Sequence, residues 1–154
     1  QNLARMGMEA NCVTADLMEW QPNRAYDAIL LDAPCSATGT WRRHPEVLQL
    51  TTEADILELA QLQRTMLERA WTWVKPGGKL VYCVCSLEPE EGEKQATRFL
   101  SEHPDATLLP VNAAETEIPT ACISPEGYLR TRPDILHEIG GMDGFFAACF
   151  VKTN

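Results

Sequence analysis

The sequence has no long apolar run, no internal repeat and little positive charge. No stretch approaches the ~20 apolar residues that a membrane-spanning helix needs, and no basic start followed by an apolar stretch suggests a signal peptide. Lys and Arg number 13 against 22 Asp and Glu, which gives a net charge of −9. Because phosphates repel an acidic surface, we do not expect this chain alone to grip nucleic acid.

Cysteine is present, but not in the patterns of disulfide, redox or zinc proteins. The six cysteines are spread too thinly for a small secreted disulfide scaffold. There is no Cys-x-x-Cys, Cys83 and Cys85 lack the usual zinc spacing, and the three histidines are scattered. We therefore predict reduced thiols in a cytoplasmic protein that binds no metal.

The composition that remains is that of one globular domain. Of the 154 residues, 45% are apolar and 23% charged, enough to bury a core. Apolar patterns and turn residues predict helices and strands in alternation. The predicted helices are residues 1–6, 52–74 and 89–102, and Thr52 with Asp55 three residues later predicts the cap of the second of them. The predicted strands are residues 11–14, 28–31, 79–84 and 144–151, with a short strand near 128–129.

This alternation predicts an α/β sheet with helices on both faces. The uninterrupted apolar run of residues 28–31 is typical of an interior strand of a parallel sheet, buried on both faces. The first predicted helix has neither an initiator Met nor a capping residue before it, and Gly7 fits a left-handed cap after it. We therefore expect the sequence to be a piece of a longer protein.

Side chains capable of chemistry follow the predicted strands. Asp16, Asp32 and the two cysteines 83 and 85 stand at strand ends, and ligands of α/β sheets bind beyond the carboxyl ends of strands. Acids there can hold the amino or hydroxyl groups of a nucleotide-like ligand. The positive end of a helix opened by Pro89 would favour the thiolate of Cys85, as a nucleophile requires. Packing of small buried residues would explain the cysteines equally well.

One basic cluster, made of Arg42, Arg43 and His44, lies near these strand ends. Such a cluster can receive a phosphate, although a basic triplet on a loop is usually only solvated. No glycine-rich loop of the kind that cradles a cofactor is present, because Gly77 and Gly78 lead into a strand and not into a helix.

Two cysteine motifs resemble those of the RNA cytosine-5 methyltransferases. They are DAPCSATGT at residues 32–40 and YCVCS at residues 82–86. Shorter segments narrow the resemblance to the branch that acts on bacterial 16S ribosomal RNA: RRHPE at 42–46, LAQLQ at 59–63, PEE at 89–91 and DGFF at 143–146. The resemblance covers nearly the whole chain and is weakest between residues 110 and 130.

The resemblance implies a Rossmann-like methyltransferase that uses S-adenosylmethionine. It implies that Cys85 is the nucleophile and that Cys35 assists product release. Asp16 and Asp32 match acids that line the S-adenosylmethionine site, and the basic cluster becomes a candidate contact for ribosomal RNA. One departure is Cys83 with Val84, where the family has a small residue and Thr.

Parts of the family pattern are missing, and two other functions stay open. The glycine-rich cofactor loop and the RNA-binding domain would lie upstream of Gln1, so we expect residues 1–154 to be the C-terminal portion of one catalytic domain. Such a fragment would bind cofactor poorly and self-associate through an exposed sheet edge. The alternatives are a transfer RNA cytosine-5 methyltransferase and a non-catalytic RNA-binding or assembly module. The sequence does not contain the glycine fingerprint of an NAD-dependent dehydrogenase, which argues against that function.

Overall fold

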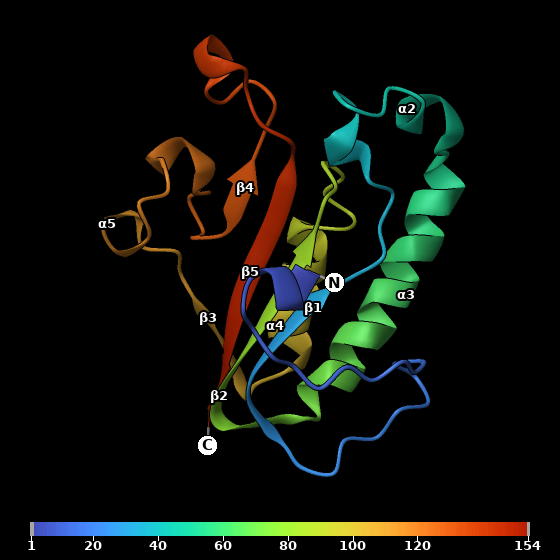
Figure 1. The fold of residues 1–154 in the computed structure, drawn as a ribbon, viewed down its shortest axis with the longest axis vertical. Coiled ribbons are helices and arrows are strands. Elements are labelled where there is room, and N and C mark those ends of the chain that lie inside the picture. Colours follow the sequence, from blue (N-terminus) through green and yellow to red (C-terminus); the bar gives the residue numbers. More distant parts are fainter. Residues whose placement is uncertain (1, 154) are drawn as a thin grey trace.

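A five-stranded mixed sheet forms the centre of the structure (Figure 1). The computed structural model describes residues 2–153. Four strands lie side by side in the order β1, β2, β5 and β3, and β4 pairs with β5. β1 runs parallel to β2, whereas β5 is antiparallel to β2, β3 and β4. The strand bounds are β1 Tyr26–Asp32, β2 Val74–Val84, β3 Ala106–Leu109, β4 Leu129–Thr131 and β5 Phe145–Lys152.

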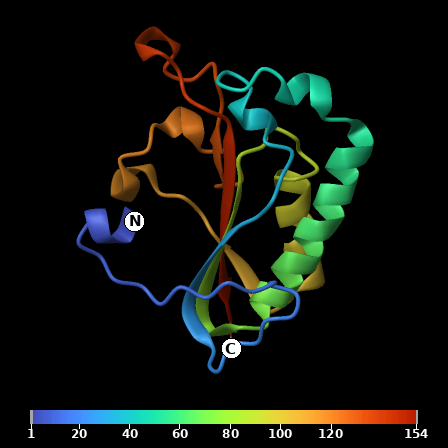
Figure 2. The same cartoon turned by 45° about the vertical axis from the view of Figure 1, so that its right-hand side comes forward.

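Two long helices, α3 and α4, pack against each other over one face of this sheet (Figures 1 and 2). The short elements α1, α5 and η2 lie on the other side (Figure 2). The predicted α/β class with a sheet flanked by helices is therefore confirmed. The helix bounds are α1 Asn2–Arg5, α2 Val47–Leu50, α3 Glu53–Trp71, α4 Glu93–Glu102 and α5 Ala113–Thr116, and the 3-10 turns are η1 Thr38–Thr40, η2 Thr120–Cys122 and η3 His137–Ile139.

The core lies between β2, β5 and the two long helices. Alternate residues of each strand face the helices because side chains on a strand point to opposite faces in turn. The strand residues of this core are Leu80, Tyr82, Val84, Phe146, Ala148 and Phe150, and the helices contribute Leu67, Ala70, Trp71, Ala96 and Phe99.

The helix predicted for residues 52–74 is present as α3. Thr52 and Asp55 form a reciprocal capping box at its start, as the sequence predicts. The helix ends at Trp71, earlier than predicted, because Val74 already pairs with Tyr26 of β1. Gly7 has the left-handed conformation expected after α1, with φ of +65°.

The helix predicted from Pro89 starts later than the sequence indicates. α4 begins at Glu93, with Gly92 as its N-cap, and residues 89–92 form a turn. The physical reason is that Glu91 points inward and is fully buried. Its carboxyl group is bound by other polar side chains and does not sit on an exposed first helical turn.

Two strand predictions are wrong. Residues 11–14 form no strand, because among residues 2–153 no strand pairs with them, and Val13 is 60% exposed. The run 28–31 does form β1, but at one edge of the described sheet and buried on one face. Leu31 is 5% exposed, whereas Leu30 on the other face is 70% exposed. β3 was not predicted, because its residues show no recognisable strand pattern in the sequence.

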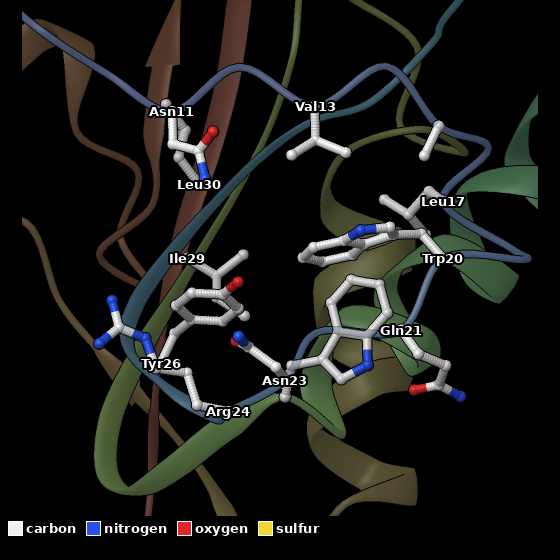
Figure 3. A pocket seen from close by; sticks show the side chains of 12 residues that line it. Asn11, Val13, Leu17, Trp20, Gln21, Asn23, Arg24, Tyr26, Ile29 and Leu30 are labelled. Carbon is white, nitrogen blue, oxygen red and sulfur yellow. The ribbon is translucent and has the colours of Figure 1, made fainter.

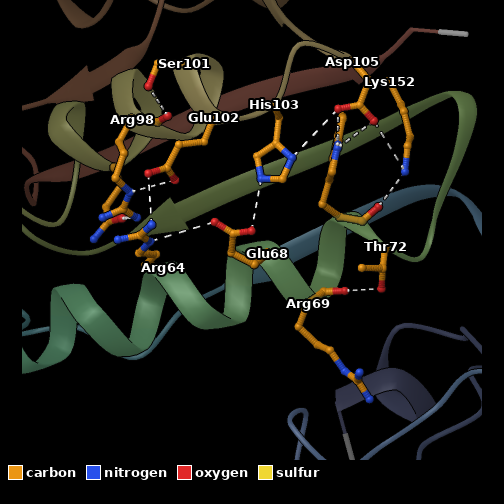
Figure 4. A network of polar contacts seen from close by, with 12 residues as sticks. Arg64, Glu68, Arg69, Thr72, Arg98, Ser101, Glu102, His103, Asp105 and Lys152 are labelled. Carbon is orange, nitrogen blue, oxygen red and sulfur yellow. Dashed lines mark hydrogen bonds and ion pairs between the residues drawn. The ribbon is translucent and has the colours of Figure 1, made fainter.

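Polar contacts join α3 to the end of α4 and the start of β3 (Figure 4). Arg64 Nη2 binds Glu102 Oε1 at 3.0 Å, and His103 Nε2 lies 3.2 Å from Glu68 Oε2. The indole Nε1 of Trp71 donates to Asp105 at 3.2 Å. Exposed ion pairs of this kind contribute about 0–1 kcal/mol each, so the packing beneath them provides most of the stability.

Within the described residues, no helix combines the length and the apolar character needed to cross a membrane. The six cysteines are all free thiols.

We predict that Phe99→Ala lowers the free energy of unfolding by about 3–5 kcal/mol, the usual cost of truncating a buried phenylalanine. The Phe99 ring is 1% exposed and packs 4.7 Å from Phe150 and 5.2 Å from Trp71, between ring centroids. Urea unfolding measures the change. Leu57→Ala on the exposed side of α3 is the control and should stay within about 0.5 kcal/mol. Equal losses in both variants would contradict this description of the core.

Candidate active site

Two thiols meet where β1 and β2 end. The strands are parallel neighbours in which Asp32 pairs with Cys83, so their carboxyl ends coincide. Cys85 directly follows β2, and Cys35 lies in the loop that follows β1. The two Sγ atoms are 3.4 Å apart, within hydrogen-bond distance for sulfur. The two residues that the sequence proposed as a functional pair are therefore in contact.

Their surroundings favour the protonated form of Cys35. Burial, the adjacent Cys85 and the charge of Glu91 raise the pKa of the Cys35 thiol to about 12. At neutral pH Cys35 therefore keeps its proton. Whenever Cys85 is a thiolate, the S–H of Cys35 is the donor between the two. The helix end expected to support that thiolate is not directly beside it, since α4 begins only at Glu93.

A buried carboxyl group lies beneath the two cysteine-bearing loops. Glu91 is fully buried and accepts hydrogen bonds from Ser36, Ser86 and Gln63. Sequence reasoning assigned no role to Glu91 or Gln63. A signal for Gln63 existed: it stands four residues after Leu59 and four before Leu67, in the apolar stripe of α3, where a polar residue needs a buried partner.

Backbone contacts fasten the loop after β1 to its neighbours. The N–H of Gly39 donates to the carbonyl of Cys85 at 3.0 Å, and the N–H of Gly144 donates to the carbonyl of Gly39 at 2.8 Å. Gly39 has no room for a side chain, since an added Cβ would overlap the carbonyl oxygen of Gly144. The backbone at Cys85 is thereby tied to η1 and to the start of β5.

Asp32 and Cys83 form a second acid–thiol contact on the face of the sheet opposite the long helices. Cys83 Sγ lies 3.8 Å from Asp32 Oδ1. Burial and the negative charge of Asp32 raise the pKa of the Cys83 thiol to about 11. The Asp32 side chain is exposed, so its carboxylate is accessible to a ligand that offers N–H or O–H donors.

Asp16 makes no hydrogen bond to the Cys35–Cys85 pair in the part of the chain that the structure describes. Asp16 Oδ1 accepts the backbone N–H of Met18 at 2.8 Å and its carbonyl accepts from Trp20, so Asp16 caps its own turn. Within residues 2–153 its hydrogen bonds are all local. The turn is anchored by Trp20, whose ring packs edge-on against Trp73 at 5.3 Å and whose carbonyl accepts from Arg69. A role for Asp16 in binding a cofactor stays a prediction.

A groove of about 860 Å³ lies between residues 11–24 and β1 (Figure 3). Trp20 and Trp73, whose rings pack edge-on, belong to its lining. Ile29 and Leu30 of β1 contribute apolar surface. Neither cysteine of the pair nor Asp32 lines it. This hollow therefore belongs to the open edge of the sheet, where the predicted strand 11–14 did not form.

The basic cluster contacts the loop before β5. Arg43 Nε donates to Asp143 Oδ2 at 2.8 Å, and Arg42 donates to the carbonyl of Gly140. His44 Nδ1 lies 3.3 Å from Glu46 Oε1. The Arg43 side chain is still 62% exposed, so it can meet a phosphate only in competition with Asp143. Contact with RNA stays a prediction for all three residues.

We predict that Gly39→Ala lowers the free energy of unfolding by about 1–3 kcal/mol, because the new methyl group forces apart backbones that now touch. Chemical denaturation measures the loss. Gln49→Ala, on the exposed surface of α2, is the control and should stay within about 0.5 kcal/mol. An unchanged free energy of unfolding in Gly39→Ala would contradict the prediction, because it would show that the loop can move aside to accept the methyl group.

A second prediction concerns the Cys83 thiol. Asp32→Asn removes the negative charge beside it, which lowers the pKa of Cys83 and increases its thiolate fraction at a fixed pH. Alkylation of Cys83 by iodoacetamide near pH 9, followed by mass spectrometry, should become severalfold faster. Asp27→Asn is the matched control on the same strand, because Asp27 pairs with Lys75 instead. A slower reaction in Asp32→Asn would contradict the charge effect.

Comparison with known proteins identifies the family to which this chain is similar. The family described as 16S rRNA methyltransferase RsmB/F matches residues 1–151. Two relatives are named ribosomal RNA small subunit methyltransferase B. The protein of Klebsiella pneumoniae is 50% identical over a match that covers 70% of this chain and 26% of the relative. The protein of Pectobacterium atrosepticum is 43% identical over a match that covers 99% of this chain and 33% of the relative. The chain thus spans about a third or less of the relatives it matches.

A solved structure shares the fold. NSun6 from Pyrococcus horikoshii, determined with SFG, superposes with a TM-score of 0.79 at 27% identity, over 99% of this chain and 37% of that one. Its fold agrees with the Rossmann-like class that the sequence predicted. Because the family match extends over nearly every residue, this chain belongs to the 16S rRNA methyltransferase RsmB/F family.

Proposed function

We propose that the natural protein carrying this chain transfers a methyl group from S-adenosylmethionine to C5 of a cytosine in 16S ribosomal RNA, through a covalent bond between Cys85 and C6. The observation that carries the proposal is the 3.4 Å contact between Cys85 and Cys35 at the joined ends of two parallel strands. The names of the relatives support the reaction and the substrate. Because the chain spans only part of their length, the activity belongs to the whole protein.

The chemistry of cytosine explains why a thiolate is needed. C5 is a poor nucleophile until a group adds at C6 of the ring. Addition of the Cys85 thiolate to C6 gives C5 carbanion character, so that C5 can accept a methyl group. A base then removes the C5 proton, and the bond between C6 and the Cys85 sulfur breaks.

Cys35 suits the last of these steps. Its thiol keeps its proton at neutral pH and lies in contact with Cys85 Sγ. In this proposal the S–H of Cys35 donates to the departing sulfur and stabilises the thiolate that leaves. Without Cys35 the elimination step slows, and the RNA stays attached to the protein.

Asp32 is proposed to bind the polar edge of the base. Its exposed carboxylate lies beside β2 and can accept a hydrogen bond from the N4 amino group, and from N3 once N3 takes up a proton as the thiolate adds. The target base must be unstacked or single-stranded to be reached. Arg42, Arg43 and His44 are the proposed contacts for the RNA backbone, since all three are exposed.

S-Adenosylmethionine supplies the methyl group when it is bound. Asp16 and Asp32 are the residues of this chain proposed to hold it, and the fit is uneven. The accessible carboxylate of Asp32 suits a ligand with amino or hydroxyl donors, whereas the carboxylate of Asp16 already caps its own turn. NSun6, the structural relative determined with SFG, an analogue of S-adenosylmethionine, supports this choice of methyl donor. A cytoplasmic location is part of the proposal, and the six free thiols support it.

We predict opposite failures for the two cysteine variants. The natural protein is incubated with radiolabelled S-adenosylmethionine and unmodified 16S ribosomal RNA. Cys85→Ala should abolish labelling at C5 of cytosine, because no thiolate remains to add at C6. Cys35→Ala should accumulate a covalent protein–RNA adduct, visible as a gel band that survives denaturation. Cys12→Ala, an exposed thiol outside the pair, is the control and should behave as wild type.

Turnover at the wild-type rate in Cys85→Ala would refute the assignment of the nucleophile. Labelling of transfer RNA in place of ribosomal RNA would move the proposal to the transfer RNA enzymes. A third outcome is that the wild type labels neither RNA and does not crosslink to RNA containing 5-fluorocytosine. That result would favour a non-catalytic RNA-binding or assembly module.

A further inference from the structure

The side chain of Glu91 is bound through both of its oxygens. Oε1 accepts the backbone N–H of Ser36 at 2.9 Å and the amide Nε2 of Gln63 at 2.8 Å. Oε2 accepts the hydroxyl of Ser86 at 2.5 Å and that of Ser36. Donors thus occupy both oxygens, which is the pattern of an ionised carboxylate that only accepts hydrogen bonds.

The partners of Glu91 lie next to the two cysteines. Ser36 directly follows Cys35, and Ser86 directly follows Cys85. Gln63 also donates to the carbonyl of Pro34, which precedes Cys35, at 2.9 Å. The carboxylate therefore binds the residue after each thiol, and Gln63 links it to the backbone before Cys35.

Glu91 itself has little freedom to move. The hydroxyl of Tyr82, a core residue of β2, donates to the carbonyl of Glu91 at 2.6 Å and to Gln63 Oε1 at 3.0 Å. Ser86 Oγ in turn accepts the N–H of Glu88 at 3.0 Å. Glu91 is therefore fixed to β2 through its carbonyl and to α3 through its carboxylate.

A charge in this position needs an explanation beyond stability. Taking a carboxylate out of water is unfavourable, and replacing buried charges by apolar side chains of similar volume is often neutral or stabilising. Glu91 is fully buried, and no Lys or Arg of the described residues forms an ion pair with it. What the carboxylate provides, and an apolar side chain cannot, is a fixed set of hydrogen bonds to both loops.

We propose that Glu91 is a positioning residue that sets the separation and relative orientation of the Cys35 and Cys85 thiols. The inference rests on the proposed function, because there the thiol of Cys35 must reach the sulfur of Cys85 as that sulfur leaves the base. Without the carboxylate, the loops after β1 and β2 lose the link that runs through Glu91, while the hydroxyl contacts of Ser36 and Thr38 with Ser86 and the backbone contact at Gly39 remain. The charge of Glu91 also contributes to the raised pKa of Cys35, so the same group influences which thiol of the pair keeps its proton.

The test compares Glu91→Gln with Glu90→Gln in the natural protein. Both substitutions replace a carboxylate by an amide of the same size, but Glu90 faces Lys94 and does not contact the cysteine loops. In Glu91→Gln the new amide N–H₂ points at donors, so we expect kcat for methyl transfer to fall on the order of 100-fold, as for a displacement of about 1 Å at a reacting group. KM for the RNA should stay unchanged, because Glu91 is buried and cannot touch it.

A second readout separates positioning from general loss of structure. The rate of Cys35 alkylation by iodoacetamide is followed against pH, with the modified residue identified by mass spectrometry. Removing the charge of Glu91 should move the midpoint for Cys35 to lower pH, whereas Glu90→Gln should leave it in place. A purely structural role would lower the melting temperature of Glu91→Gln without a change in kcat or in the midpoint of the folded protein, and would overturn the proposal.

If Glu91→Gln does not fold, Gln63→Met decides. It removes the donor to Glu91 and to Pro34 from α3, at a position that contacts neither cysteine. A lower kcat at unchanged KM supports the proposal, and a wild-type kcat overturns it. Failure of the proposed function has a different signature: Cys85→Ala would keep its activity, while the shift in Cys35 alkylation in Glu91→Gln would still report on Glu91.

Discussion

The parallel pairing of β1 and β2 is the constraint on which the cysteine end of the molecule depends. Parallel neighbours end at the same edge of a sheet, and the register of Asp32 with Cys83 brings the two following loops together. Only a few residues of each loop are then needed to place Cys35 in contact with Cys85. An antiparallel pairing, such as that of β2 with β5, would have sent one of the two loops to the opposite edge.

Pairing alone does not fix the loops, and the molecule adds two kinds of link. One is made by backbone, where Gly39 joins Cys85 and Gly144 with no side chain between them. The other is made by Glu91, whose carboxylate binds Ser36 and Ser86 from within the core. The first link fixes distance through close approach, and the second adds direction because hydrogen bonds to a carboxylate have preferred geometry.

The sequence predicted what depends on local pattern and failed where tertiary partners decide. The capping box of Thr52 and Asp55 and the strand after Gly144 are local signals, and both were confirmed. Residues 11–14 have strand composition, but a strand forms only when another strand pairs with it. Glu91 lies two residues after Pro89, in the first turn of the helix predicted for residues 89–102. Its burial depends on Ser36 and Gln63, which are far away in the chain.

The same distinction applies to the site. The resemblance pointed to Cys35 and Cys85, and the structure brings them into contact. The protonation of the flanking thiols could not be foreseen, since it depends on burial and on acids brought near by folding. The pKa of Cys35 is raised mainly by burial, as is that of Cys83, with Glu91 and Asp32 adding negative charge. At neutral pH both flanking thiols therefore act as hydrogen-bond donors. Neither therefore competes with Cys85 as the nucleophile of the proposed reaction, in which Cys85 adds to the base and the S–H of Cys35 stabilises the thiolate that leaves.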